Sequence, residues 1–178
     1  MDLARLYADA EAQGPLPPVS KWNPPFCGNI DMRIRHDGTW LYNGTAITRP
    51  AMVRLFAGIL RREDDAYYLV TPVEKVGITV EDVPFIAVEM TSDKSVLTFR
   101  TNVGDRVTAD KAHPFRFEAE AEGFRPYICV RDGLEARLSR SLAQELAAMG
   151  EVREHAGELW FGIPCGALFF PVIPADCL

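Results

Sequence analysis

MRIRHDG, from Met32 to Gly38, and ICVRDG, from Ile128 to Gly133, are the two stretches that decide the fold. In each, polar and apolar residues alternate, and an Asp-Gly pair comes at the end. Alternation is typical of a half-buried strand, and Asp-Gly tolerates the positive φ angles of a tight hairpin. The sequence therefore predicts two hairpins, whose second strands are residues 39–42 and 134–138.

A helix is expected to begin shortly after each hairpin. The first begins around Thr48-Arg49-Pro50, and Pro50 suits its first turn. Either Thr48 or Arg49 is the cap, because a residue before proline avoids the α region. The second helix begins at Ser139, whose hydroxyl is a natural N-cap.

The apolar spacing gives each helix one buried face. We expect Arg61 and Arg62 at the carbonyl end of the first helix, where cations are favourable, and Gly150 after the second. The residues predicted to share a face are Val53, Phe56, Ala57 and Leu60 in the first helix, and Leu138, Leu142, Leu146 and Met149 in the second.

Both helices lead into a further hairpin and an apolar strand. Five ordered elements thus recur at matching spacing, which indicates a duplicated unit of strand, turn, strand, helix and hairpin. With only three predicted helices, the fold class is α+β with mostly antiparallel sheets. The strands predicted after the helices and between the copies are residues 67–72, 76–80, 85–90, 96–102, 115–118, 159–164 and 167–172.

The chain is divided by these signals into three parts. Residues 1–28 are an N-terminal helix and a Pro-rich arm, 29–94 the first repeat unit, and 95–178 the second repeat unit with its connecting strands. The N-terminal helix is predicted over Asp2–Gln13 and is ended by Gly14 and Pro15.

Composition argues against several classes of partner. The formal net charge is −6, and an acidic chain without a Lys/Arg cluster is a poor ligand for nucleic acid. No apolar run approaches the roughly 20 residues that span a bilayer, and the first residues lack a signal-peptide layout, so we expect a cytoplasmic protein. Most of the 19 basic residues are arginine, which reflects either GC-rich coding or arginines that pair with carboxylate or phosphate.

Metal, cofactor and catalytic signals are weak. The cysteines at 27, 129, 165 and 177 form no C-x-x-C pair, and the three histidines are far apart, so we expect free thiols and neither a metal nor a cofactor. No nucleotide-binding or hydrolase motif is present. Spacing cannot select a catalytic pair among Glu63, Glu74, Asp82 and Glu135, so no catalytic residue is assigned and an enzyme is not the favoured reading.

Arg33 and Arg35 share one face of the first strand with Asp31. The simpler interpretation is a solvated outer face. The functional interpretation is a polar wall that lines a cleft.

Arg49 and Arg140 stand at the starts of the two central helices, where a cation opposes the helix dipole at roughly 0.3–1 kcal/mol each. One explanation is a local carboxylate, such as Asp37 or Asp132. The other is an anion held jointly by the arginine and the free helix N–H groups.

Polar residues at strand ends complete the predicted binding set, because loops at strand ends can line a site. Turn chemistry explains most of the segment from Thr71 to Lys75. The residues predicted to bind ligand are Arg33, Arg35, Arg49, Thr71, Glu74, Lys75, Arg100, Asn102, Arg131 and Arg140.

Eight short motifs occur along the chain: IDMRI (30–34), DGTW (37–40), GTAI-x-R (44–49), LF-x-x-ILRRE (55–63), TPVEK (71–75), VED-x-PF (80–85), TNVGD (101–105) and VR-x-GLEA (130–136). Together they resemble a bacterial family called domain of unknown function 1285. The resemblance implies two repeated α+β motifs and a ligand-binding or signalling role, with no established reaction. Cys165 departs from the pattern, since a small hydroxyl residue is expected there.

The leading hypothesis is a non-enzymatic protein that binds a small anion between the two copies, with a signalling or regulatory role. The alternative is a protein-interaction module, in which the apolar run Leu168–Ile173 mediates a homodimer. A hydrolase or transferase that uses cleft carboxylates comes third.

Overall fold

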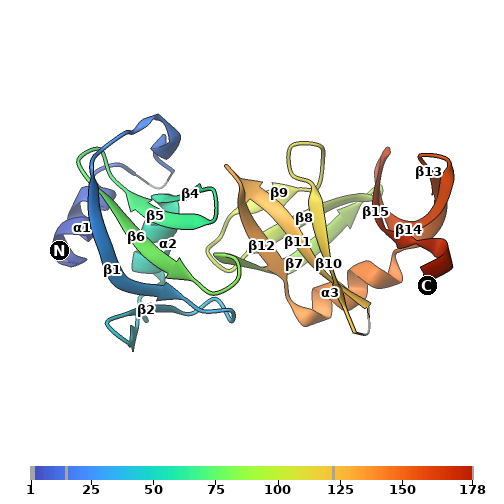
Figure 1. Cartoon of the computed structure of the whole chain (residues 1–178), viewed down its shortest axis with the longest axis horizontal. Helices are drawn as coiled ribbons and strands as arrows, with labels where there is room; N and C mark the ends of the chain where they lie inside the picture. Colours follow the sequence, from blue (N-terminus) through green and yellow to red (C-terminus); the bar gives the residue numbers. More distant parts are fainter. Residues whose placement is uncertain (1–2, 15, 122, 178) are drawn as a thin grey trace. The chain divides into compact units, whose positions relative to one another are not determined.

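The computed structural model describes residues 3–14, 16–121 and 123–177, and it divides them into two compact units. Unit 1 is residues 1–84 with 132–134, and unit 2 is residues 85–131 with 135–178. The boundary between the repeats that the sequence predicts, at 94/95, lies C-terminal to the division at 84/85. The elements, drawn in Figure 1, are α1 Leu3–Glu11, η1 Val19–Lys21, β1 Phe26–Ile34, β2 Trp40–Tyr42, β3 Thr45–Ala46, α2 Pro50–Gly58, β4 Leu60–Glu63, β5 Ala66–Val70, β6 Lys75–Val80, β7 Phe85–Asp93, β8 Val96–Thr101, β9 Arg106–Thr108, β10 Phe115–Glu120, β11 Gly123–Arg131, β12 Leu134–Leu138, α3 Arg140–Ala148, β13 Glu151–His155, β14 Glu158–Cys165, β15 Leu168–Pro174 and η2 Ala175–Cys177.

The two Asp-Gly hairpins and the α+β class are confirmed. Asp37 accepts a hydrogen bond from the Thr39 N–H at 2.9 Å, and Gly38 takes a φ of +84°, so the turn returns the chain to pair β2 with β1. β12 covers the predicted residues 134–138. The order of strand, turn, strand, helix and hairpin recurs in β1–β5 with α2 and in β11–β14 with α3.

The predicted end of the first central helix is wrong. α2 ends at Gly58, and Leu60, Arg61 and Arg62 belong to β4 instead. Leu60 pairs with Leu69 of β5, and both side chains are buried, so the burial available in the sheet outweighs helix propensity.

The second central helix needs smaller corrections. Leu138 ends β12 rather than sharing the face of α3, and Met149 is the C-cap, with 36% of its surface exposed. Ser139 is the N-cap as predicted, and its hydroxyl accepts the Leu142 N–H at 3.4 Å. In α2 the cap is Arg49, whose side chain makes no capping bond.

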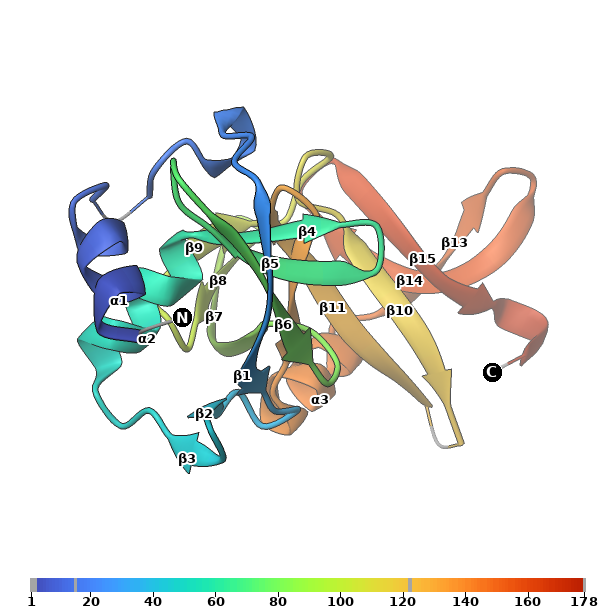
Figure 2. The same ribbon diagram turned by 60° about the vertical axis from the view of Figure 1, so that its left-hand side comes forward.

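The N-terminal helix is shorter than predicted. α1 ends at Glu11 rather than Gln13, whereas Asp2 and Pro15 lie outside the described residues. Its apolar face buries Leu6, and Tyr7 meets Phe56 of α2 edge to face at 6.3 Å. α1 and α2 therefore lie side by side, as Figure 2 shows.

The sheets contain a second repeat that the sequence pattern does not reveal. The strand order is β3-β2-β1-β6-β5-β4 in unit 1 and β10-β11-β12-β7-β8-β9 in unit 2. In each sheet, two three-stranded meanders meet at a central parallel pair, β1 with β6 and β7 with β12. Both sheets are therefore mixed and have the same topology. β13, β14 and β15 form a separate antiparallel sheet.

Aromatic contacts build the core of each unit. In unit 1, Trp40 of β2 stacks on Phe56 of α2 at 6.5 Å, and both are fully buried. In unit 2, Phe115 of β10 meets Phe99 of β8 at 5.6 Å and Phe170 of β15 at 5.1 Å. The Phe170 contact joins the small C-terminal sheet to the six-stranded one.

Candidate functional site

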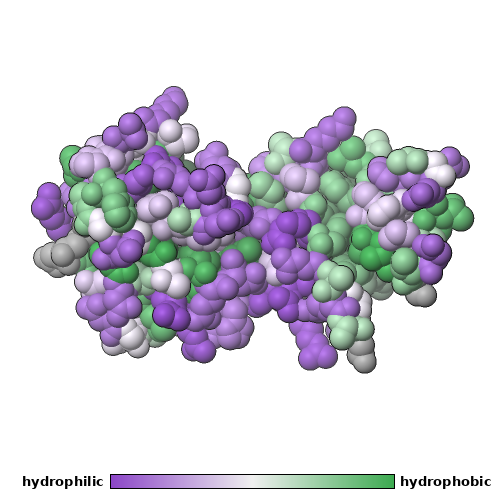
Figure 3. All heavy atoms as spheres, viewed as in Figure 1, coloured by the Kyte–Doolittle hydropathy of each residue, from purple (hydrophilic) through white to green (hydrophobic). Residues whose placement is uncertain are grey.

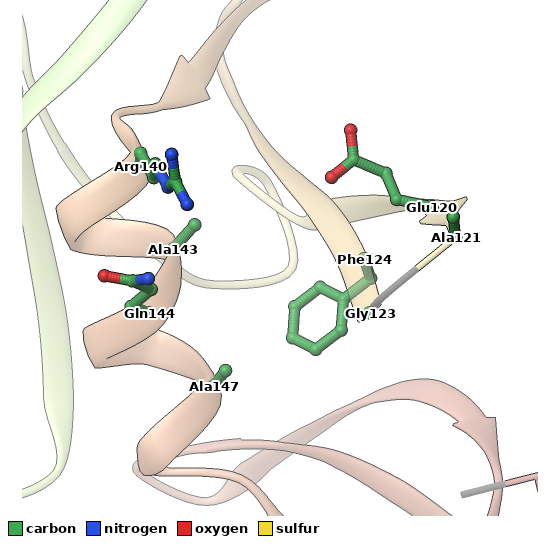
Figure 4. A pocket seen from close by; sticks show the side chains of 8 residues that line it. All are labelled: Glu120, Ala121, Gly123, Phe124, Arg140, Ala143, Gln144 and Ala147. Atoms are coloured by element: carbon green, nitrogen blue, oxygen red, sulfur yellow. The ribbon is translucent and has the colours of Figure 1, made fainter.

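A groove in unit 2 separates α3 from the hairpin of β10 and β11 (Figure 4). It encloses about 710 Å³, which is within the range of small-molecule sites. Its lining residues are Glu120, Ala121, Gly123, Phe124, Arg140, Ala143, Gln144 and Ala147.

The helical wall presents Arg140, Ala143, Gln144 and Ala147, which have the spacing of one helix face. Phe124 forms the facing wall. Its ring is held by neighbouring aromatic rings, with Phe117 edge to face at 5.3 Å and Phe161 at 6.3 Å. The groove thus has one aromatic wall and one helical wall with small side chains.

A smaller cavity of about 250 Å³ adjoins the groove and shares Glu120, Phe124, Arg140 and Ala143 with it. It adds two more cations, Arg125 and Arg137. Arg125 forms an ion pair with Glu120. Among the residues that the structure describes, three arginines and one glutamate line the two cavities, in a chain whose net charge is −6.

Arg140 is the residue of this site that lacks a compensating charge. It is exposed at the first turn of α3, and its guanidinium has no ion pair or hydrogen bond within residues 3–14, 16–121 and 123–177. Neither alternative local carboxylate, Asp37 or Asp132, pairs with it there. Its position also opposes the helix dipole, so nothing local explains an arginine at this site.

The predicted binding residues of the first strand have local carboxylate partners. Arg33 lies 3.5 Å from Glu81, and Arg35 lies 3.8 Å from Asp37. His36 donates its backbone N–H to Glu81, which holds the pKa of that carboxyl below its ordinary value. These contacts fit the simpler interpretation of a solvated, ion-paired face.

The turn between β5 and β6 contains three more predicted residues. The Thr71 hydroxyl is fully buried and accepts the N–H groups of Val73 and Glu74 at 3.4 and 3.3 Å. Lys75 binds Glu63 at 2.9 Å. Glu74 is buried, and its Oε1 has no hydrogen-bond partner within the described part of the chain. Turn chemistry therefore accounts for Thr71, and an ion pair for Lys75.

The remaining predicted residues of unit 2 also have structural contacts. Arg100 pairs with Glu89 at 2.6 Å, and Asn102 accepts the Ile86 N–H at 3.0 Å. Arg131 pairs with Asp105 at 2.6 Å and lies 5.0 Å above the Phe85 ring.

Of the ten predicted residues, Arg140 lines the groove, and the other nine are not among its lining residues. Arg49 is exposed at the cap of α2, where its guanidinium has no ion pair among the described residues. Sequence reasoning missed Phe124 and Gln144. The available signal was the spacing Arg140, Ala143, Gln144, Ala147, but a helix face says nothing about what lies opposite.

An ion-pair network supports the β10 side of the site. Arg116 binds Glu135 of β12 through two hydrogen bonds of 2.8 and 2.9 Å and also pairs with Glu118. Its guanidinium lies 3.9 Å from the centre of the Tyr127 ring. The two carboxylates raise the pKa of Arg116, and Arg116 lowers the pKa of Glu118, so both stay charged.

No carboxylate pair with the raised pKa values of an acid catalyst is found among the described residues. The carboxyl pKa values that depart from their ordinary values, those of Asp37, Glu63, Glu81 and Glu118, are all lowered. Within the same residues, no group of three or more His, Cys, Asp or Glu side chains could hold a metal ion.

Two family models match the chain, the N-terminal domain of DUF1285 over residues 17–83 and the C-terminal domain over residues 84–172; both describe domains of unknown function. The chain belongs to the DUF1285 family. No curated protein matches it. The division between the two family domains, at 83/84, lies one residue before the main division between units 1 and 2, at 84/85.

Two solved DUF1285 structures are similar to this chain. The protein from Silicibacter pomeroyi DSS-3 has 48% identity and a TM-score of 0.85, and the match covers 96% of each chain. The protein from Shewanella baltica OS155 has 30% identity and a TM-score of 0.54, over 66% of this chain and 90% of that one. None of the helices formed by the described residues has the length and apolarity that a membrane crossing requires.

Proposed function

We propose that this DUF1285 protein binds a small organic anion in the groove beside α3 and is not an enzyme. The observation that carries the proposal is Arg140, which lines a groove of about 710 Å³ and has no ion pair among the residues that the structure describes. An arginine guanidinium offers a planar fork of donors that matches carboxylate and phosphate oxygens. The local cost of a cation at a helix start is then offset when an anion binds.

The surrounding charges support this interpretation. Arg125 and Arg137 line the adjoining cavity, whereas Glu120 is neutralised by its ion pair with Arg125. The positive charge of Arg140 in a concave site raises the local concentration of anions, even on an acidic protein. The originally predicted position, between the two copies, stays a prediction.

A thermal-shift experiment at low salt tests the proposal with acetate, inorganic phosphate and a set of organic acids. A ligand present at 100 times its Kd adds about 2.7 kcal/mol of stability. For a chain of this size we expect a rise in Tm of roughly 5–11 °C.

The matched variants are Arg140→Ala, Arg49→Ala and Arg54→Ala. Arg54 is an exposed arginine of α2 that is not among the groove residues, so its loss controls for net charge. Arg140→Ala is expected to abolish the shift, and Arg54→Ala to preserve it. The proposal fails if no anion stabilises the wild type more than Arg140→Ala.

A cytoplasmic location and a signalling or regulatory role belong to the same proposal. All four cysteines are free thiols, at positions 27, 129, 165 and 177, as is usual in a reducing compartment. A protein that binds a ligand without converting it can act as a sensor, because the bound and free forms can differ in their affinity for a partner. Ligand-dependent capture of a second protein from the same cytoplasm would test the role directly.

A homodimer through the C-terminal sheet is the second candidate function. β15 is an edge strand, and all seven of its residues are half-buried rather than buried. Figure 3 shows hydrophobic side chains on the surface at this sheet, and Val152 and Leu159 of the same sheet are 47% and 60% exposed. Light scattering should then give a dimer that Ile173→Lys dissociates. A monomer whose β15 amides are fully protected from hydrogen exchange would exclude this interface.

A further inference from the structure

Resting on the proposed function, we infer that the ligand is an amphipathic organic carboxylate, with its acid group on Arg140 and its apolar body between Phe124 and Ala147. The groove has two chemically different ends. Arg140 lies at the end where α3 begins, and Ala147 lies seven residues further along, about 10 Å at 1.5 Å per residue.

The charges of the groove favour a single negative charge. Arg125 is paired with Glu120, whereas Arg140 lines the groove and has no ion pair within the described part of the chain. With Glu120 and Arg125 paired, the described lining of the groove offers one positive charge to a ligand. A phosphate monoester carries about −1.5 to −2 at pH 7, whereas a carboxylate carries −1. The groove is therefore better matched to a carboxylate.

The rest of the groove favours an apolar body. Beyond Arg140, the helical wall presents the methyl groups of Ala143 and Ala147, and the Phe124 ring lies opposite (Figure 4). The ring is half-buried and is supported by Phe117 and Phe161, so it does not need to reorganise to accept a ligand. Gln144 supplies the polar group between the two ends, with both a donor and an acceptor.

Titration calorimetry with acetate, octanoate, 3-phenylpropanoate and inorganic phosphate tests the inference. Each buried CH₂ strengthens binding about fourfold, so octanoate and 3-phenylpropanoate should bind at least tenfold more tightly than acetate or phosphate. The amide resonances of Gly123 and Ala147 should shift in NMR titrations with the two larger acids.

Two substitutions separate the two ends of the groove. Arg140→Gln should weaken octanoate about tenfold or more, because a charge-assisted hydrogen bond is lost. Ala147→Leu fills the apolar end and should weaken the binding of octanoate more than the binding of acetate. Ala148→Leu is the matched control, since Ala148 is exposed on the same helix but is not among the groove residues.

The outcomes distinguish this inference from the proposed function. If acetate or phosphate binds as tightly as octanoate, and Ala147→Leu has no effect, the amphipathic ligand is refuted while anion binding stands. If no acid binds the wild type, both ideas fail. If Ala148→Leu weakens the binding of octanoate as much as Ala147→Leu does, the apolar body lies elsewhere and the inference is overturned.

Discussion

Replacing Arg116 with methionine tests whether the contacts of Arg116 stabilise the packing of β10, β11 and β12. Methionine keeps most of the length of the side chain and removes its charge. It deletes the bidentate contact with Glu135, at 2.8 and 2.9 Å, and the contact with the Tyr127 ring at 3.9 Å. It also removes the Arg116 guanidinium from the Glu135 carboxylate, whose side chain is only 13% exposed.

The expected cost follows from these contacts. A charged hydrogen bond contributes about 1.5–3 kcal/mol, and a cation over an aromatic ring about 0.5–1 kcal/mol at an exposed site. The Arg116 side chain is 41% exposed, so solvent screens part of this energy, and the exposed pair with Glu118 adds little. We expect a loss of about 2–3 kcal/mol in the free energy of unfolding, or roughly 4–12 °C in Tm.

Urea denaturation and calorimetry measure this loss. Arg106→Met is the matched control, because Arg106 is exposed in the same unit and has no ion pair among the described residues. A double-mutant cycle with Glu135→Gln should recover most of the loss as a coupling energy. If Arg116→Met stays within 0.5 kcal/mol of the wild type, like the control, the network does not stabilise the sheet.

Three further predictions concern single side chains. Arg140→Ala should raise the free energy of unfolding by about 0.3–1 kcal/mol without ligand, because it removes a cation from the positive end of α3; a clear loss on urea denaturation would contradict this. The buried Cys165 thiol accepts the Leu97 N–H at 3.4 Å and donates to the Ala109 carbonyl at 3.3 Å. Cys165→Ala should therefore lower the free energy of unfolding by about 1–2 kcal/mol, and Cys165→Ser by less. Equal losses on urea denaturation would show that the thiol acts through volume alone. The hydrogen bond from Lys75, followed by that from Arg61, holds the pKa of Glu63 below its ordinary value of 4.5. The resulting stabilisation of the fold is present above pH 4.5 and is lost as the pH falls through the lower folded pKa. Lys75→Met should therefore flatten the acid limb of the curve of unfolding free energy against pH, and an unchanged limb would refute the link.

The candidate site was only partly predictable. The sequence predicts Arg140 as a binding residue because a cation at a helix start breaks a local electrostatic rule, and such a rule can be checked from neighbours in the sequence. Phe124 and Gln144 break no local rule. From the sequence, Arg33 and Arg35 are equally plausible binding residues on their strand. The partner of Arg33, Glu81, belongs to a distant segment, whereas the partner of Arg35, Asp37, lies two residues away.

Local chemistry was enough to determine the turns and one helix start of this protein from its sequence. The Asp37-Gly38 hairpin and the Ser139 cap form within a few residues, so their hydrogen bonds need no distant partner. The end of α2 depends on Leu69, because Leu60 pairs with Leu69 across β4 and β5 instead of continuing the helix. The matching order of the two six-stranded sheets, and the groove between α3 and Phe124, likewise arise from contacts between distant segments. Only the tertiary structure decides these features, because pairing and burial between distant segments outweigh the local preferences of each segment.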